Sequence, residues 1–451
     1  MNESGRRDED GRRDNDGRRD EDRRPRKAIR SQKVERRHQI VGRRDTLRAG
    51  LAATMVGLAG CLGTSDDDPP DVFPVLDPDA HPGSPEDGWP TFQYDAANTG
   101  FGPGPEPTDP VDERWRFPTG GPVYSSPAVL DGRVYVGSQD GVYAIDADDG
   151  TEHWWLRTNA RVASSPAVVD GVVYVGANDG HLYAIDGDAG DELWTFEADD
   201  WIPASPTVAD GVVYVGSNDA TLYAIDTDSG DEVWAFEEPG DPVQRAAAVV
   251  DGTVYAGSND RHVYAVDAET GEEEWRFETA GLVQSRPTVV DGTLYVGSND
   301  ESVYALDAET GEEEWAAETN SSVTGSPAVV EGALYVGSFD TNVYAISTGR
   351  GEQALEEGGN EREPDDEERI DAGGVFWRAG PYQEVRSSPA LVGETLYVGA
   401  GSPFVYALSA RDGSVRWRYE TEGAVNSSPA VVDGVLYVGC DDGYVYALEE
   451  S

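Results

Sequence analysis

Short runs in which apolar and polar residues alternate with a period of two follow one another along residues 113–450. In one stretch the runs cover 162–169, 171–177, 181–186 and 192–198. This alternation is typical of half-buried strands, and no helical periodicity accompanies it. Asp-Gly and Asn-Asp-Gly turn sequences separate the runs, so consecutive strands are expected to pair as hairpins. The pattern predicts an all-β chain built from four-stranded antiparallel units.

The unit recurs eight times. Each copy has one tyrosine in its second run, and these are Tyr135, Tyr174, Tyr214, Tyr255, Tyr295, Tyr335, Tyr397 and Tyr437. Their spacings are 39, 40, 41, 40, 40, 62 and 40 residues. A period near 40 indicates a solenoid or a propeller, and four strands per unit favour a propeller blade. The long spacing indicates an insertion within 348–374, expected to be a solvated acidic loop between the third and fourth strands of blade six.

The fourth strands predict how the propeller closes. Seven of them contain a tryptophan, namely Trp154, Trp194, Trp234, Trp275, Trp315, Trp377 and Trp417. The eighth unit ends before a fourth strand, but residues 113–119 supply one with Trp115. This tryptophan precedes Pro127 by 12 residues, the same gap as between Trp194 and Pro206. We therefore predict an eight-bladed β-propeller, closed by an N-terminal strand and left without an exposed edge.

Two segments resemble a known family. The sequence YAVDAETGEEEW at 264–275 is similar to the tryptophan-docking motif of the PQQ-like (quinoprotein-type) β-propeller family. The sequence GWPTFQYDAANTGF at 88–101 resembles the lead-in of secreted members from halophiles. The resemblance covers residues 88–451, and it implies that each of the eight tryptophans packs between neighbouring blades.

Charge divides the chain into two parts. Residues 1–60 carry a net charge of +6 and residues 61–451 a net charge of −59, and the only lysines are Lys27 and Lys33. An acidic body excludes a nucleic-acid partner, which requires a cationic face. Repulsion within the body opposes folding, but in about 1 M salt the Debye length is roughly 3 Å. The composition resembles proteins of salt-accumulating archaea, and we expect the fold to need molar salt.

The N-terminal 60 residues resemble an export signal that follows a charged tail. Residues 1–30 form a low-complexity tract with nothing to bury. Arg43 and Arg44 precede the apolar run 49–60, which is too short to span a bilayer, since about 20 residues are needed. Paired arginines before such a run resemble a twin-arginine signal. The alternative is a short buried helix.

The apolar run ends at Cys61, and the preceding Leu-Ala-Gly resembles a lipobox. This resemblance implies export to the outer face of the cell membrane and anchoring by lipid alone, with Cys61 as the lipidated residue. Residues 61–87 are rich in proline and acid and predict an extended tether. Residues 88–451 then form the propeller, which we expect to be a monomer.

The positions that break the repeat mark a candidate site. In such a propeller the first strand of each blade lines the central channel, and three arginines stand there where small or uncharged residues are usual. Arginine suits anions such as carboxylates. The predicted binding residues at the channel mouth are Tyr124, Gln244, Arg245, Gln284, Arg286, Arg386 and Asn426. They predict a protein or small anionic ligand. The alternative is an ordinary polar, hydrated channel wall.

Two further groups of residues have the side chains of metal ligands, but neither predicts a metal site. Residues 186–191 superficially resemble a calcium loop, but they coincide with the docking turn and lack the twelfth-position glutamate, so turn chemistry is favoured. His181 and His262 share a repeat position, but they belong to blades that are not neighbours. A joint metal site at these histidines is therefore not expected.

Two functions remain. The first is a non-catalytic binding or assembly scaffold without a cofactor, resembling the BamB-like lipoprotein propellers of outer-membrane barrel assembly. The second is a PQQ-dependent dehydrogenase. The dehydrogenases of this family carry Glu, Asn and Asp calcium ligands, a catalytic Asp and usually adjacent cysteines. Here the channel columns offer only Asn426, and Cys440 is the only cysteine of the body. The sequence favours the scaffold over PQQ with calcium, while enzyme activity stays open.

Replacing the predicted lipidation site should release the protein. One acyl chain gives only marginal membrane binding, whereas two chains anchor stably. We therefore expect Cys61→Ser protein to appear in the culture medium, while the wild type stays with the membranes. Cell fractionation followed by immunoblotting measures this distribution. Retention of Cys61→Ser in the membrane fraction would contradict the lipobox interpretation.

Overall fold

The computed structural model describes residues 88–102, 104–330, 332–349, 370–380 and 383–451. These residues belong to one compact unit. The predicted tail, export signal, Cys61 anchor and tether lie outside the described residues, as does most of the insertion. None of the described residues forms a helix long and apolar enough to cross a membrane.

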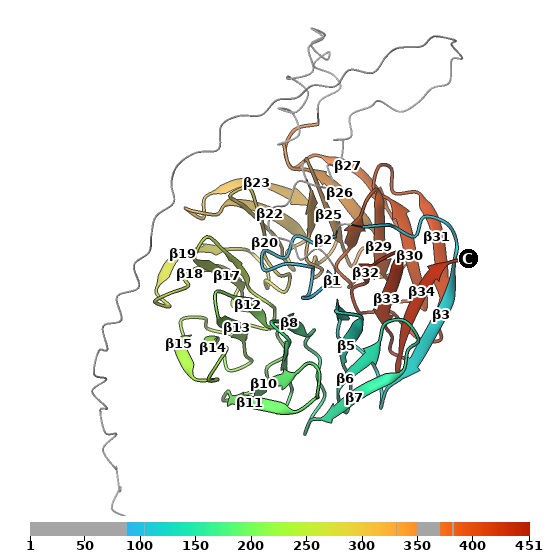
Figure 1. Cartoon of the computed structure of the whole chain (residues 1–451). Helices are drawn as coiled ribbons and strands as arrows, with labels where there is room; N and C mark the ends of the chain where they lie inside the picture. The colour runs from blue at the N-terminus through green and yellow to red at the C-terminus, as the bar shows by residue number, and fades with distance from the viewer. Residues whose placement is uncertain (1–87, 103, 331, 350–369, 381–382) are drawn as a thin grey trace, which may run out of the picture. The chain divides into compact units, whose positions relative to one another are not determined.

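The described chain forms eight sheets around one centre, each with four antiparallel strands, and two of them carry a fifth strand (Figure 1). No helix occurs among the described residues. The eight-bladed, all-β propeller is therefore confirmed. Blades one to four comprise β4 (Ala128–Leu130), β5 (Arg133–Gly137), β6 (Gly141–Asp146) and β7 (Glu152–Arg157); β8 (Ala167–Val169), β9 (Val172–Gly176), β10 (His181–Asp186) and β11 (Glu192–Glu197); β12 (Thr207–Ala209), β13 (Val212–Gly216), β14 (Leu222–Asp226) and β15 (Glu232–Phe236); and β16 (Ala248–Val250), β17 (Thr253–Gly257), β18 (His262–Asp267) and β19 (Glu273–Glu278).

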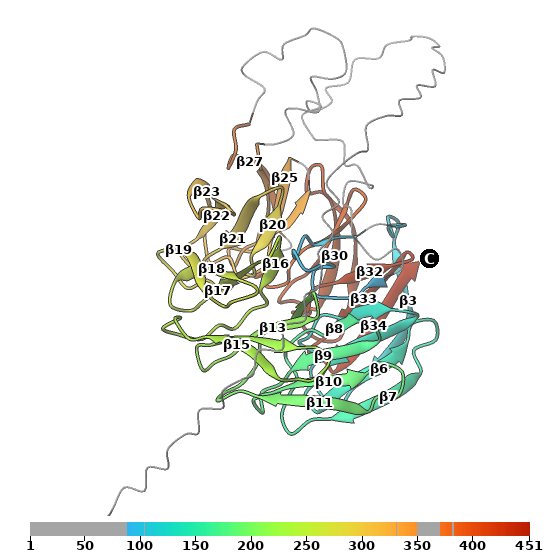
Figure 2. The ribbon, with the colours of Figure 1, turned by 60° about the vertical axis from the view of Figure 1, so that its left-hand side comes forward.

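The remaining four blades repeat this order. They comprise β20 (Thr288–Val290), β21 (Thr293–Gly297), β22 (Ser302–Asp307) and β23 (Glu313–Glu318); β24 (Ala328–Val330), β25 (Ala333–Gly337), β26 (Val343–Ser347) and β27 (Val375–Ala379); β28 (Ala390–Val392), β29 (Thr395–Gly399), β30 (Phe404–Ser409) and β31 (Val415–Glu420); and β32 (Ala430–Val432), β33 (Val435–Gly439), β34 (Tyr444–Glu450) and β3 (Val111–Pro118). The turned view shows the strands of blade two following one another from β8 outward to β11 (Figure 2).

Turn chemistry fixes the hairpins. In blade two, Asp170 and Gly171 connect β8 to β9 with φ angles of 50° and 78°. A two-residue turn of this type needs positive φ at both positions, which glycine adopts freely and aspartate tolerates. The middle strands of the blade are then buried on both faces between neighbouring blades, and Val173 of β9 and Leu182 of β10 are fully buried. The Asp-Gly signals of the sequence therefore set both the pairing and the core.

The N-terminal strand β3 belongs to the same sheet as the C-terminal strand β34. The two pair in antiparallel register, and Trp115 lies opposite Ala447. In Figure 1 the cyan β3 runs along the red β34 at the outer edge of blade eight. The sheet order β3-β34-β33-β32 follows, so segments from the two ends of the propeller share one blade.

Tryptophans connect neighbouring blades. Seven of the eight indoles donate a hydrogen bond of 2.8–3.0 Å from Nε1 to a backbone carbonyl outside their own sheet. These belong to Trp115, Trp154, Trp194, Trp234, Trp275, Trp377 and Trp417. The next blade supplies the carbonyl in every case but Trp417, where Pro107 supplies it. Trp315 is the exception, because its buried Nε1 has no partner among the described residues. It faces blade six, whose sequence carries the insertion.

The segment before β3 crosses the centre of the ring, which the sequence analysis did not anticipate. Strand β1 (Gly88–Trp89) pairs with β4 of blade one, and β2 (Phe101–Gly102) pairs in parallel with β28 of blade seven. Between them, backbone carbonyls accept hydrogen bonds from the innermost strands of other blades; the acceptors are Pro90, Ala96, Ala97 and Thr99. This lead-in segment, residues 88–102, therefore blocks the channel at the level of the innermost strands.

Loss of the Trp115 indole from β3 should lower the stability of the whole propeller. Trp115 is 8% exposed, and removing a buried tryptophan side chain costs about 3–5 kcal/mol. We expect Trp115→Ala to lower the free energy of unfolding by that amount in 3 M KCl. Trp155→Ala removes an indole that is 44% exposed in β7, and should cost about 1 kcal/mol or less. Denaturant unfolding of the two variants measures the difference, and equal losses would contradict the role of β3.

Candidate binding site in the central channel

A ring of hydrogen bonds surrounds the channel just before the innermost strands. At one position per blade, the backbone N–H of one blade donates to the serine Oγ of the next, at 2.8–3.1 Å. The six bonds run from Arg286 to Ser326, Ser326 to Ser388, Ser388 to Ser428, Ser428 to Ser126, Ser126 to Ser165 and Ser165 to Ser205. The repeated serine therefore holds the inner ends of the blades together.

The ring is interrupted where the sequence departs from serine. Ala246 in blade four and Arg286 in blade five have no hydroxyl to accept the N–H groups of Ser205 and Ala246. The side chain of Arg286 lies across this gap, and its Nη2 donates to Ser205 Oγ at 2.8 Å. Because alanine is small, blade four leaves room for the guanidinium. The two departures from the repeat therefore act together.

The guanidinium of Arg286 is almost fully enclosed. The side chain is only 8% exposed, and its Cζ lies 3.2 Å from the centroid of the Phe92 ring, which the lead-in segment supplies. Nη1 is buried and has no hydrogen-bond partner in the described part of the chain. Burial, together with the charge of nearby Arg245, lowers the pKa of Arg286 well below its ordinary value. A buried cation with an unused donor is thus placed in the channel of an acidic protein.

Arg245 adds a second cation without a carboxylate partner. Its Nε donates to the backbone carbonyl of Gln284 at 2.8 Å, and burial lowers its pKa. Neither Arg245 nor Arg286 takes part in any of the ion pairs found within the described residues. The positive charge at this point is therefore not neutralised by any carboxylate of the described residues.

These groups line a cavity of about 90 Å³, here called the inner cavity. Five of the seven predicted site residues lie on its wall, namely Tyr124, Arg245, Arg286, Arg386 and Asn426. Phe92 and five serines of the ring complete much of the lining. The contribution of Phe92 was missed from sequence, since it lies outside the repeat.

Gln244 and Gln284 do not line the inner cavity. Their amides alternate with asparagines of neighbouring turns in a ladder of hydrogen bonds of 2.9–3.2 Å, which involves Asn218, Gln244, Asn259, Gln284 and Asn299. The Asn-Asp turns that follow the second strands of blades three, four and five supply these asparagines. Both glutamine side chains are therefore occupied within the protein, and the recurring asparagines were the sequence signal for this pairing.

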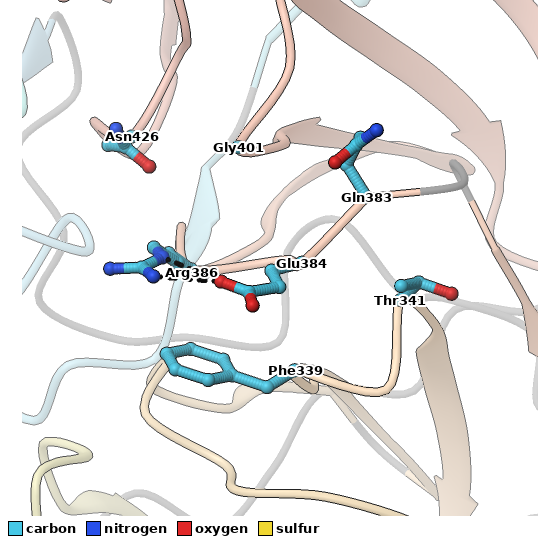
Figure 3. Close-up of a pocket in the computed structure, with 7 residues that line it drawn as sticks. All are labelled: Phe339, Thr341, Gln383, Glu384, Arg386, Gly401 and Asn426. Atoms are coloured by element: carbon cyan, nitrogen blue, oxygen red, sulfur yellow. Dashed lines mark hydrogen bonds and ion pairs between the residues drawn. The ribbon is translucent and has the colours of Figure 1, made fainter.

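A second pocket, of about 440 Å³, opens beside the inner cavity and is here called the outer pocket. Its lining residues come from blades six, seven and eight and are Phe339, Thr341, Gln383, Glu384, Arg386, Gly401 and Asn426 (Figure 3). Arg386 and Asn426 line both spaces. Unlike Arg286, Arg386 is neutralised, because its Nη2 donates to Glu384 Oε2 at 2.8 Å.

Acceptor groups without donors lie beside the outer pocket. Asn426 donates from Nδ2 to Asp441 Oδ2 at 2.9 Å. The Oδ1 atoms of both residues are buried and have no hydrogen-bond partner among the described residues. Burial raises the pKa of the Asp441 carboxyl. Figure 3 shows the Asn426 carbonyl oxygen turned toward the pocket. The two spaces therefore differ in charge, because Arg245 and Arg286 line only the inner cavity and Glu384 lines only the outer pocket.

The remaining candidates have local roles. Asp186 Oδ1 accepts the N–H groups of Asp188 and Ala189 at 3.0 and 2.7 Å, as in a side-chain-stabilised turn. His181 and His262 each lie near an aspartate of their own blade, Asp179 and Asp260. Within the described residues, no group of three or more His, Cys, Asp or Glu side chains is arranged to hold a metal ion.

Solved structures share this fold. BamB from Moraxella catarrhalis has a TM-score of 0.62 and 22% identity, over 75% of this chain and 98% of that one. A europium-containing methanol dehydrogenase has a TM-score of 0.66 and 15% identity, over 80% and 98%. The computationally designed Ika8 protein has a TM-score of 0.64 and 17% identity, over 75% and 99%. At these identities the likeness concerns the fold alone. No curated protein matches the sequence significantly.

A family model described as outer membrane protein assembly factor BamB matches the repeats directly. The matched segments are 110–200, 142–259, 241–372 and 366–451. Together they include every blade and well over half of the chain. The protein therefore belongs to the PQQ-like β-propeller family described as outer membrane protein assembly factor BamB.

Proposed function

We propose that the protein is a non-catalytic binding scaffold that takes an anionic group of a protein or small ligand at its channel mouth. The enclosed, unpaired guanidinium of Arg286 carries this proposal. Removing a charge from water is unfavourable unless a partner compensates it. No carboxylate of the described residues pairs with Arg245 or Arg286, so a bound anion would supply the missing negative charge.

The residues of the channel do not fit PQQ with calcium. No carboxylate is among the described residues that line the inner cavity, so neither a calcium ligand set nor a general base is offered there. A space of about 90 Å³ amounts to roughly three water molecules, too little for a fused three-ring cofactor. The acidic Glu384 in the outer pocket would also oppose a multiply charged acid. These features support the scaffold over a PQQ-dependent dehydrogenase.

We further propose that the scaffold works outside the cell membrane. The paired arginines Arg43 and Arg44, the apolar run and Cys61 support export and a lipid anchor. The family description, outer membrane protein assembly factor, supports a place in the cell envelope. In this proposal the propeller is a monomer, tethered by residues 61–87, with its channel mouth available to a partner.

Adding PQQ and Ca²⁺ to the purified full chain in high salt tests the scaffold against the enzyme. We expect no cofactor absorption band and no alcohol-dependent dye reduction. Anionic peptides and sugars, at concentrations near 100 times their dissociation constants, should stabilise the fold by about 2.7 kcal/mol. This is measured as a rise in melting temperature, which should be clearly smaller for Arg286→Ser at the same ligand concentration. Dye reduction that requires both PQQ and alcohol would overturn the proposal in favour of a dehydrogenase.

A further inference from the structure

We infer that the inner cavity and the outer pocket form one site for a small hydroxy- or amino-carboxylate, bound with its carboxylate in the inner cavity and its donor-bearing body in the outer pocket. The inference deepens the proposed function, since it names the ligand class of the same channel mouth. It is carried by the different charge of the two spaces, with two arginines without a carboxylate in the inner cavity and an arginine–glutamate pair in the outer pocket, and by their shared wall.

The inner cavity is lined by hydrogen-bond donors. Each ring serine uses its Oγ to accept an N–H group from the neighbouring blade, and a hydroxyl has only one hydrogen to donate. No acceptor for that hydrogen exists within the described chain for the five serines on the cavity wall, which are Ser126, Ser165, Ser326, Ser388 and Ser428. These hydroxyls are free to turn toward a bound group.

Two cations complete this donor surface. Arg286 and Arg245 both line the cavity, and Nη1 of Arg286 has no partner. The serine hydroxyls and the two guanidinium groups on this wall favour an oxyanion, because its lone pairs can accept from several groups together. The volume of about 90 Å³ admits a head group such as a carboxylate but not a ring.

The outer pocket has a different charge. Arg386 is already paired with Glu384, so no uncompensated cation remains there for a second anionic group. The Asn426 carbonyl oxygen lacks a donor. Leaving such a buried acceptor unsatisfied costs free energy that a ligand hydroxyl or N–H group recovers. The volume of about 440 Å³ suits a body the size of one sugar ring or a dipeptide.

The site therefore selects one carboxylate at one end of a donor-rich molecule. Both a sugar acid and a free amino acid or peptide C-terminus have this chemistry. Glucuronate and glycylglycine are suitable probes for the two sources, and glucose, acetate and sulfate separate the contributions of body and head group.

Calorimetric titration of the full chain at fixed ionic strength tests the inference. We expect glucuronate or glycylglycine to bind more tightly than acetate, and glucose to bind at least tenfold more weakly than glucuronate. Arg286→Ser should weaken carboxylate binding by about ten- to hundredfold, as expected for a charge-assisted contact. This change restores the repeat residue, whose Oγ can accept the Ala246 N–H, so the fold should be retained. Arg245→Ser, also the repeat residue, provides a second variant.

Arg161→Ser is the matched control. Arg161 is exposed and lies over the ring of Tyr124 at 5.5 Å, but it does not line either space. The Arg161→Ser substitution removes the same charge near the inner cavity and should leave carboxylate binding within twofold of the wild type. Equal binding by wild type and Arg286→Ser, equal affinity for glucose and glucuronate, or binding of sulfate alone would each overturn the inference. The proposed function is overturned by a different result, dye reduction that requires both PQQ and alcohol, so the two failures can be told apart.

Discussion

Neighbouring blades of this propeller are held together by a tryptophan indole that donates its N–H to a backbone carbonyl beyond its own sheet. The contact needs a turn of the next blade that has no side chain against the face of the indole. At Gly190, for example, φ is +73° and an added Cβ would lie 2.6 Å from the ring of Trp154. Glycine is the residue that meets both conditions at no steric cost. Because this tryptophan contact joins the blades at the outer side of the propeller, the fold places weaker demands on the residues that face the channel. That freedom is what allows Ala246, Arg245 and Arg286 to replace the residues of the repeat.

The repeat made the architecture predictable. Its eight copies gave the number of blades, and the position of Trp115 assigned residues 113–119 to the last blade. The channel was harder. Arg286 and Arg386 both precede an innermost strand, at repeat positions two residues apart, yet Glu384 neutralises only Arg386. Gln244 and Gln284 were predicted to contact a ligand but bind asparagines of neighbouring turns. Such pairings depend on which turn lies beside which strand, information that a repeat pattern does not contain.

The lead-in segment shows the same limit. Residues 88–102 follow no period, so their path could not be deduced from the blades. Their composition held a clue, because this stretch contains four large aromatic residues, all of them buried, namely Trp89, Phe92, Tyr94 and Phe101. By lying across the ring, this segment turns a channel into a blind cavity whose wall includes Phe92. The acidic exterior would not steer an anion toward it over long distances. Binding must therefore come from short-range contacts, which salt screens much less.

The central claim is that uncompensated positive charge in the blind channel is matched by a bound anion. Bromide reports on this directly, since it carries a negative charge, is small enough for the inner cavity and scatters anomalously. Crystals of the full chain grown in sodium bromide should show an anomalous difference peak between Arg245 and Arg286, and crystals of Arg286→Ser should lose it. A wild-type map with bromide peaks elsewhere on the protein but none beside these two arginines would contradict the account.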